Sequence, residues 1–254
     1  MPAVLSLTSL AVLGGTILLS SFISGTFGMA GGMVLLGVLL VYFPVATGMV
    51  LFSAIQFVAN GWRAVLWWRY VRWAIFNLYV VGSLIAFAIL RAIAYIPDKA
   101  TVYILLGLMP FAVEILPLRA RPNIEWRGVP FITGFLTTVV QFMAGVGGPF
   151  LDVFFQKSLL DRKTTLATKA VTQSFSHVLR AAYFGSFTNM SFDAPWTLAG
   201  AILVAIIGTS VTPLIIERMT DHGFRQWTRA IILTVSSIYL VRGAWLFWRA
   251  WHGA

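Results

Sequence analysis

The sequence predicts an all-α polytopic membrane protein with two inverted-topology repeats, about eight transmembrane helices and two half-helices after glycine-rich breaks. Composition is the first reason, since 59% of the residues are hydrophobic, 10% are charged and the mean hydropathy is +0.88. Soluble domains carry far more charge. The second is a set of apolar runs near the roughly 20 residues that span a hydrocarbon core. The third is an internal repeat, which divides one transmembrane domain into about 1–117 and 118–254.

Apolar runs bounded by Arg, Pro and Gly define the expected spans. They cover residues 4–24, 46–61, 74–95, 100–117, 128–144, 164–184, 195–216 and 228–248. The first is expected to be a span and not a removed signal peptide, because no basic region precedes it and no clear cleavage site follows. Two further runs, 33–43 and 149–158, are each about 15 Å long as helices and follow glycine clusters directly. They are predicted to be half-helices.

The formal net charge of +10 comes from Lys and Arg residues scattered over short connections, which argues against nucleic acid as a partner. Connections around 63–72, 119–127, 157–163 and 218–229 are basic, and the positive-inside rule places them in the cytoplasm. Connections 42–48, 97–99 and 186–194 contain one Lys in total and are expected outside. Both termini then lie outside, although Arg242 and Arg249 leave a both-inside arrangement open.

The chain contains no cysteine and only three histidines, at positions 177, 222 and 252. This composition excludes disulfides, thiolate nucleophiles and cysteine-based metal sites, and it argues against any metal centre. We expect no cofactor.

The internal repeat has an offset of 116 to 117 residues. Gly28-Met-Ala-Gly-Gly32 recurs as Gly145-Val-Gly-Gly148, and the helix after each half-helix carries four residues at matching positions, all of them polar except one alanine. These are Ser53, Gln56, Asn60 and Arg63 in the first half and Ala170, Gln173, His177 and Arg180 in the second. Each half holds five segments, and an odd number reverses the direction of the second copy. The repeat is therefore predicted to be inverted.

Glycine clusters at membrane depth indicate either close helix packing or an unwound backbone beside a cavity. Pro149 directly follows Gly147-Gly148, at a position where proline favours the start of a helix, so we favour a break. The N-terminus of a half-helix presents free N–H groups and about half a positive charge, which suits an anion. The predicted contributors to an anion site are Gly28, Gly31, Gly32, Met33, Gly145, Gly147 and Gly148.

Polar stripes on two helices complete the predicted site. Lys169, Gln173, His177 and Arg180 share one face of their helix, and Ser53, Gln56, Asn60 and Arg63 share one face of the other. Charges in the bilayer cost about 2.5–3.5 kcal/mol each, so such faces should line a wet or anion-filled cavity. Snorkelling of the two arginines towards the interface is the alternative. Asp152 is expected to pair with Lys169, or else to carry a coupling proton.

The segments Ser24-Gly-Thr-Phe-Gly-Met-Ala-Gly-Gly32 and Met143-Ala-Gly-Val-Gly-Gly-Pro149 resemble those of the sulfite exporter TauE/SafE family. The resemblance covers nearly the whole chain. It implies a transporter of the bacterial cytoplasmic membrane, and not an enzyme, that usually exports sulfite or another small sulfur-containing or organic anion such as thiosulfate, a sulfonate or sulfoacetate. Many members carry a longer glycine run and then Val-Pro, where this chain has Met33-Val34 and Pro149-Phe150.

The predicted function is transport of a small anion by alternating access between the two repeats, with the anion and the lipid bilayer as partners. A passive anion channel is the nearest alternative. An intramembrane hydrolase is more distant, since no Gly-x-Ser-x-Gly-like motif is present, and an assembly subunit without transport is equally distant. Proton coupling, through Asp152 or His177, and homo-oligomerisation stay open.

Overall fold

The computed structural model describes residues 7–27, 30–188, 195–210 and 221–253, and this part of the chain forms ten α-helices and no strand. The all-α prediction is confirmed. The helices are α1 (Leu7–Phe27), α2 (Ala30–Tyr42), α3 (Val45–Leu66), α4 (Trp73–Ile93), α5 (Lys99–Ile115), α6 (Val129–Ala144), α7 (Gly148–Phe155), α8 (Arg162–Gly185), α9 (Pro195–Ser210) and α11 (Asp221–Trp251). Two short 3-10 helices, η1 (Trp68–Tyr70) and η2 (Leu118–Ala120), lie in connections.

Helix α2 begins three residues earlier than predicted. Gly31 and Gly32 therefore lie in its first turn and not before it. A methyl group at position 31 would overlap the backbone of α1 at Ser20 and Ser24, so this glycine lets the two helices pack closely. Close packing, the alternative to an unwound break, thus applies to Gly31, whereas Gly28 lies outside the described residues.

Within the described residues, three helical segments are long and apolar enough to cross a membrane: Val45–Leu66, Trp73–Ile93 and Arg229–Trp251. Shorter apolar segments are Ala11–Ser24, Ala30–Tyr42, Val129–Ala144 and Ala199–Ser210. Helix α8 has 24 residues but is not among them, because much of its length is polar. Its buried polar side chains face other helices instead of lipid, which explains why an apolar criterion misses it.

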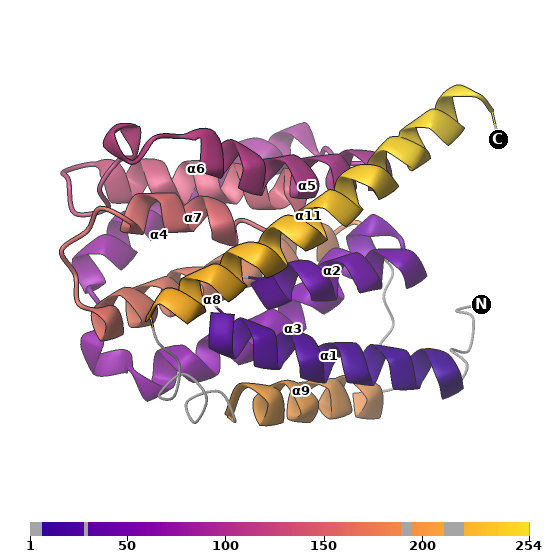
Figure 1. Cartoon of the computed structure of the whole chain (residues 1–254), viewed down its shortest axis with the longest axis horizontal. Coiled ribbons are helices and arrows are strands. Elements are labelled where there is room, and N and C mark those ends of the chain that lie inside the picture. The colour runs from indigo at the N-terminus through magenta and orange to yellow at the C-terminus, as the bar shows by residue number, and fades with distance from the viewer. Residues whose placement is uncertain (1–6, 28–29, 189–194, 211–220, 254) are drawn as a thin grey trace.

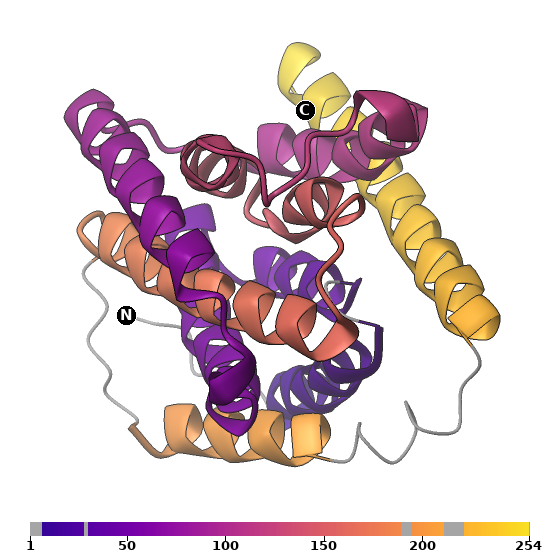
Figure 2. The same cartoon turned by 90° about the vertical axis from the view of Figure 1, so that its left-hand side faces the viewer.

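Helices α3 and α8 pack against each other at the centre of the molecule, as Figures 1 and 2 show. Helix α4 packs on α6 and α8, while α9 packs on α1 and α3, and α5 packs on α11. Under the internal repeat, the pair α4 and α6 corresponds to the pair α9 and α1, and the pair α4 and α8 corresponds to the pair α9 and α3. The pairs α3 with α8 and α5 with α11 each join equivalent helices of the two halves.

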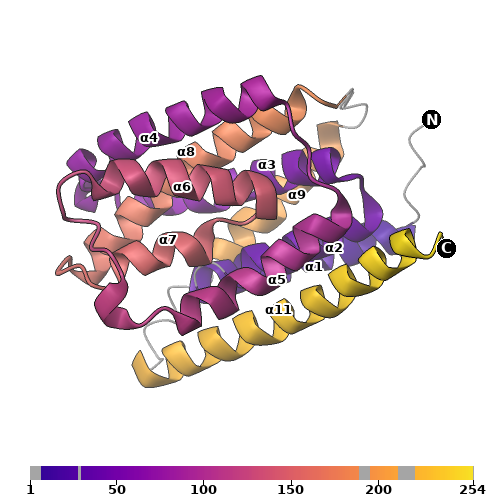
Figure 3. The ribbon, with the colours of Figure 1, turned by 90° about the horizontal axis from the view of Figure 1, so that it is seen from above.

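Both ends of the described chain lie at the same end of the bundle, on the right of Figure 1. The connections from α3 to α4, from α5 to α6 and from α7 to α8 lie at the opposite end. These connections contain the basic residues that predicted a cytoplasmic location. Figure 3 shows α6 and α7 side by side and antiparallel, so together they form a hairpin that enters the bundle from the basic end.

Acidic caps begin α5 and α8. Asp98 accepts hydrogen bonds from the backbone N–H (3.0 Å) and hydroxyl (2.6 Å) of Thr101, and Asp161 accepts the same two bonds from Thr164 (3.0 and 2.5 Å). Such bonds satisfy N–H groups that the first turn leaves free. The hydroxyl of Thr164, followed by its backbone N–H, holds the pKa of the Asp161 carboxyl below its usual value.

Candidate anion-binding site

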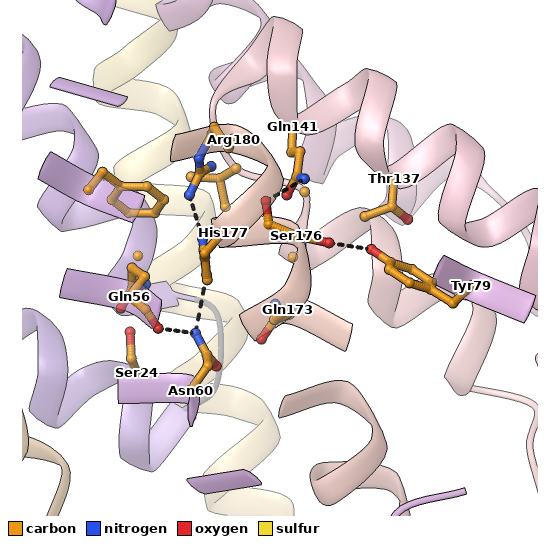
Figure 4. A pocket seen from close by; sticks show the side chains of 15 residues that line it. Ser24, Gln56, Asn60, Tyr79, Thr137, Gln141, Gln173, Ser176, His177 and Arg180 are labelled. Carbon is orange, nitrogen blue, oxygen red and sulfur yellow. Dashed lines mark hydrogen bonds between the residues drawn. The ribbon is translucent and has the colours of Figure 1, made fainter. Parts of the chain in front are cut away.

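A small cavity of about 30 Å³ is lined by residues of α1, α2, α3, α4, α6, α7 and α8 and of the connection between α6 and α7 (Figure 4). This is far below the roughly 300–1,000 Å³ of pockets for larger ligands, and matches a few ordered waters or a compact ion. Among the described residues, its walls consist mainly of amides, hydroxyls and glycines, with Arg180 as the charged residue and no carboxylate. The lining residues are Ser24, Gly32, Phe52, Gln56, Asn60, Tyr79, Thr137, Gln141, Val146, Gly147, Gly148, Gln173, Ser176, His177 and Arg180.

The second glycine cluster forms a break next to the cavity. Gly145 has a φ of +81° and ends α6, and α7 begins at Gly148 with Pro149 in its first turn. A positive φ suits glycine, and proline needs no hydrogen-bond partner at a helix start, which explains both residue types. Gly147 and Gly148 line the cavity, so the N-terminus of α7 borders it as predicted from the sequence.

Arg180 is completely buried and contacts three groups besides the His177 ring. Its Nε donates to Ser53 Oγ (2.8 Å), its NH1 group donates to the carbonyl oxygen of Gly145, and its guanidinium carbon lies 4.4 Å from the centre of the Phe52 ring. The Gly145 carbonyl stands at the end of α6, where the helix dipole is negative. Arg180 therefore holds the end of the broken helix, and full burial excludes snorkelling for this residue.

Arg63 occupies the equivalent position in the first half but does not line the cavity. Its NH2 group donates to the carbonyl oxygen of Ser24 (2.9 Å), close to the end of α1. Each arginine thus binds a backbone carbonyl near the end of the helix that precedes a glycine cluster. This common role stabilises the two helix ends.

His177 and Asn60 meet at the centre of the site, with Nε2 and Nδ2 3.3 Å apart. Their positions differ by 117, which is the offset of the internal repeat. In a two-fold arrangement, a residue and its own counterpart come into contact at the symmetry axis. The contact is therefore the one expected if an axis passes between α3 and α8.

The ring of His177 lies between two donors. Arg180 NH2 is 2.6 Å from Nδ1, and the Asn60 amide nitrogen faces Nε2 while also donating to the Gln56 carbonyl oxygen (3.0 Å). A guanidinium only donates, so Nδ1 accepts and a neutral ring carries its hydrogen on Nε2. That hydrogen then points at the Asn60 N–H group. The site consequently has more donors than acceptors.

Hydroxyl groups add further donors to the cavity wall. Ser24 Oγ and Thr137 Oγ1 are buried and have no hydrogen-bond partner among the described residues. Tyr79 and Ser176 share a hydrogen bond of 2.7 Å between their hydroxyls, and Gln141 Nε2 donates to the Ser176 carbonyl oxygen (3.2 Å). An unpaired buried hydroxyl is unfavourable unless a ligand or water satisfies it.

The sequence prediction missed the lining residues on α1, α4 and α6. A sequence pattern could have revealed the polar residues of α1 and α6. Ser20-Ser21 with Ser24 recurs as Thr137-Thr138 with Gln141, again at an offset of 117. Serine and threonine are common in apolar helices, where they bond to carbonyls of the preceding turn. The repetition, and not the residue type, carries the information.

The chain was also compared with known protein families. A sequence model of the sulfite exporter TauE/SafE family matches residues 13–240. The chain belongs to this family. The resemblance found in the sequence is thereby confirmed, and so is the expectation that the protein is not an enzyme, because TauE/SafE is a family of transporters. Membership implies membrane transport of sulfite or a related anion. No curated protein and no solved structure matches the chain.

Within this TauE/SafE protein, the structure brings together about half of the residues predicted to bind substrate. Those that line the cavity are Gly32, Gln56, Asn60, Gly147, Gly148, Gln173, His177 and Arg180. Ser53 and Gly145 stand behind them as partners of Arg180.

The remaining predicted residues lie elsewhere. Lys169 forms an ion pair with Asp152 between α8 and α7, outside the cavity lining. The carbonyl oxygen of Met33 accepts a hydrogen bond from the Tyr239 hydroxyl on α11. Gly31 packs against α1, and Gly28 lies outside the described residues. Helix spacing placed Lys169 on the same face as Gln173, but α7 occupies the space in front of that part of α8.

Proposed function

We propose that this protein carries a small anion across the bacterial cytoplasmic membrane: sulfite, or another sulfur-containing or organic anion such as thiosulfate, a sulfonate or sulfoacetate. The observation that carries the proposal is the donor-rich cavity, in which one buried guanidinium, side-chain amides and two unpaired hydroxyl groups line a space to which no described residue contributes a carboxylate. An anion supplies acceptors for the two unpaired hydroxyls, and its hydrogen bonds with the guanidinium and the amides are stronger than those between neutral groups. The family suggests export from the cytoplasm.

Alternating access between inverted repeats is the proposed mechanism, with residues 1–117 and 118–254 as the two halves of one transport unit. The helix pairs that recur in both halves and the contact between Asn60 and His177 support this arrangement. In such transporters, one repeat moves against the other around a central site. The cavity described above would then be the narrow state, which opens towards either side of the membrane in turn.

The side chains that line the cavity further restrict the class of substrate. The cavity has no acidic side chain to bind an ammonium group, so it favours an anion over a zwitterion that carries both charges. Its small volume favours a compact anion over one with a long organic chain.

The direct test is reconstitution into liposomes and measurement of labelled sulfite and thiosulfate uptake. We expect saturable uptake that is accelerated by unlabelled anion on the opposite side, because a carrier exchanges its substrate. A passive channel would instead show no acceleration. Failure to move any of the proposed anions would refute the proposed function.

The substitution Thr137→Val tests the cavity without changing its shape. Removal of one hydrogen bond to a charged ligand costs about 1.5–3 kcal/mol, so we expect the apparent affinity for the anion to fall about tenfold or more. Thr138→Val is the matched control, because its hydroxyl is also buried and unpaired but does not line the cavity. The uptake kinetics of both variants show whether the anion binds in the cavity. Equal kinetics in the two variants would place the substrate elsewhere.

A further inference from the structure

We propose that His177 takes up one proton when the anion binds, so that the anion and a proton cross the membrane together. The inference rests on the proposed anion transport and specifies its coupling ion. It starts from the position of the ring, which touches the guanidinium of Arg180 on one side and the amide of Asn60 on the other.

The empty site keeps the ring neutral. Protonation would place a second positive charge 2.6 Å from the guanidinium nitrogen of Arg180, in a buried site where no carboxylate compensates it. Two like charges at this distance repel strongly, and more so at the low dielectric of a protein interior. A neutral ring has one lone pair, on Nδ1, and Arg180 already uses it.

The described residues around the ring include no other group that would reverse this balance. On its own helix the charged neighbour is Arg180. The side chains that α3 and α6 place at the cavity are uncharged amides, hydroxyls and a phenyl ring, and α7 contributes only backbone. Helix α4 contributes Tyr79, whose hydroxyl is bonded to Ser176. The nearest acid on α7, Asp152, is held by Lys169 outside the lining.

A bound anion changes the balance in two ways. Its oxygens can accept from Nε2–H, from the Asn60 amide and from the guanidinium, which turns from the ring towards the stronger acceptor. The Nδ1 lone pair is then free, and a proton from water adds to it and forms an N–H bond. The negative charge of the anion stabilises the imidazolium that results. When the anion leaves, this N–H bond breaks and the proton returns to water.

Thermodynamic linkage makes this coupling measurable. If anion binding promotes protonation of the ring, then protonation promotes anion binding by the same factor. Anion affinity should therefore increase as the pH falls, by about tenfold per pH unit while the empty ring is neutral and the occupied ring is charged. An anion crossing with one proton also transfers less net charge across the membrane.

The experiment is calorimetric titration of the purified protein with thiosulfate, whose charge is constant over the neutral pH range. Repetition in buffers with different heats of ionisation gives the number of protons taken up. We expect about one proton per anion for the wild type and none for His177→Gln, which should bind more weakly. His252→Gln is the matched control, since His252 is exposed at the end of α11 and should behave as the wild type.

The outcomes separate the two proposals. Binding of thiosulfate by the wild type without proton uptake and without pH dependence overturns the coupling and leaves anion transport standing. A His177→Gln variant that still takes up a proton overturns His177 as the carrier. Absence of binding for thiosulfate, sulfite and sulfoacetate alike overturns the proposed function together with this inference. The wild-type measurement is decisive even if the His177 variant does not fold.

Discussion

Gly145 combines an unusual backbone conformation with a crowded position. Its φ of +81° ends α6, and a methyl group there would overlap the side chains of Leu36 and Met49. Its carbonyl oxygen also accepts a hydrogen bond from Arg180. One residue therefore connects the helix break, the core beside α2 and α3, and the charge in the cavity.

The substitution Gly145→Ala should destabilise the protein through both strain and crowding. A left-handed conformation costs an alanine about 1–2 kcal/mol, and displacing the buried but flexible ends of the Leu36 and Met49 side chains adds about 1 kcal/mol, the low end of the cost of overpacking. Gly128→Ala is the matched control, because Gly128 has the same φ of +81° with open space around it. Thermal unfolding in detergent should show a larger loss for position 145. Equal losses would mean that the crowding has no energetic effect.

Among the residues of the site, Gln56, Asn60, Gln173, His177 and Arg180 could be predicted because polar side chains at helical spacing are conspicuous in apolar helices. Tyr79 could not, since it belongs to an apolar run and reaches the cavity only where α4 crosses α8. Lys169 was predicted to belong to the site but lies outside the cavity lining. Helical spacing gives the direction in which a side chain leaves the helix axis, but not which other helix packs in that direction.

Helices α4 and α6 approach each other through glycines on both sides. A methyl group at Gly82 would overlap the Phe131 carbonyl, and one at Gly134 would overlap the Tyr79 carbonyl. Ser83 Oγ donates to the Gly134 carbonyl oxygen (3.1 Å) and bridges the two backbones. On the other side of the bundle, Gly208 of α9 lies against the α1 backbone in a similar way. Small residues are the means by which helices pack closely in lipid.

We expect Gly134→Ala to force α4 and α6 apart and to lower the melting temperature, since overpacking costs about 1–3 kcal/mol and the bond from Ser83 is weakened. Gly61→Ala is the control within a helix. Its new methyl group would meet only Ser174 Oγ, at 3.9 Å, and alanine favours helix by about 1 kcal/mol over glycine. Similar melting temperatures for the two variants would contradict close packing at Gly134.

At the scale of the whole molecule, the arrangement places basic connections at one end and both described termini at the other (Figure 1). This agrees with the orientation that the basic residues predict, with both termini outside. Each half contains one short helix in addition to its longer helices, and the chain reverses its direction once more at that helix. Each half therefore has an odd number of segments. The same geometry brings the cavity to the middle of the bundle, between α3 and α8.

The orientation can be tested by single cysteines, because the natural chain has none and gives no background. Leu159, 94% exposed in the connection from α7 to α8, should become reactive to a membrane-impermeant thiol reagent only after the cells are opened. Tyr95, 44% exposed after α4, should react in intact cells. The reverse pattern would turn the molecule over in the membrane and change the side from which the anion enters.

The sequence by itself determined the all-α membrane class, the approximate helices, the repeat offset and most of the polar face on α3 and α8. These features are local, because hydrophobic length, helical spacing and the backbone preferences of glycine and proline act over a few residues. Only the tertiary structure decided which polar residues share a cavity, that Lys169 pairs with Asp152 outside it, and that Asn60 meets His177. Those relations depend on how distant helices pack, and spacing along one helix does not contain that information.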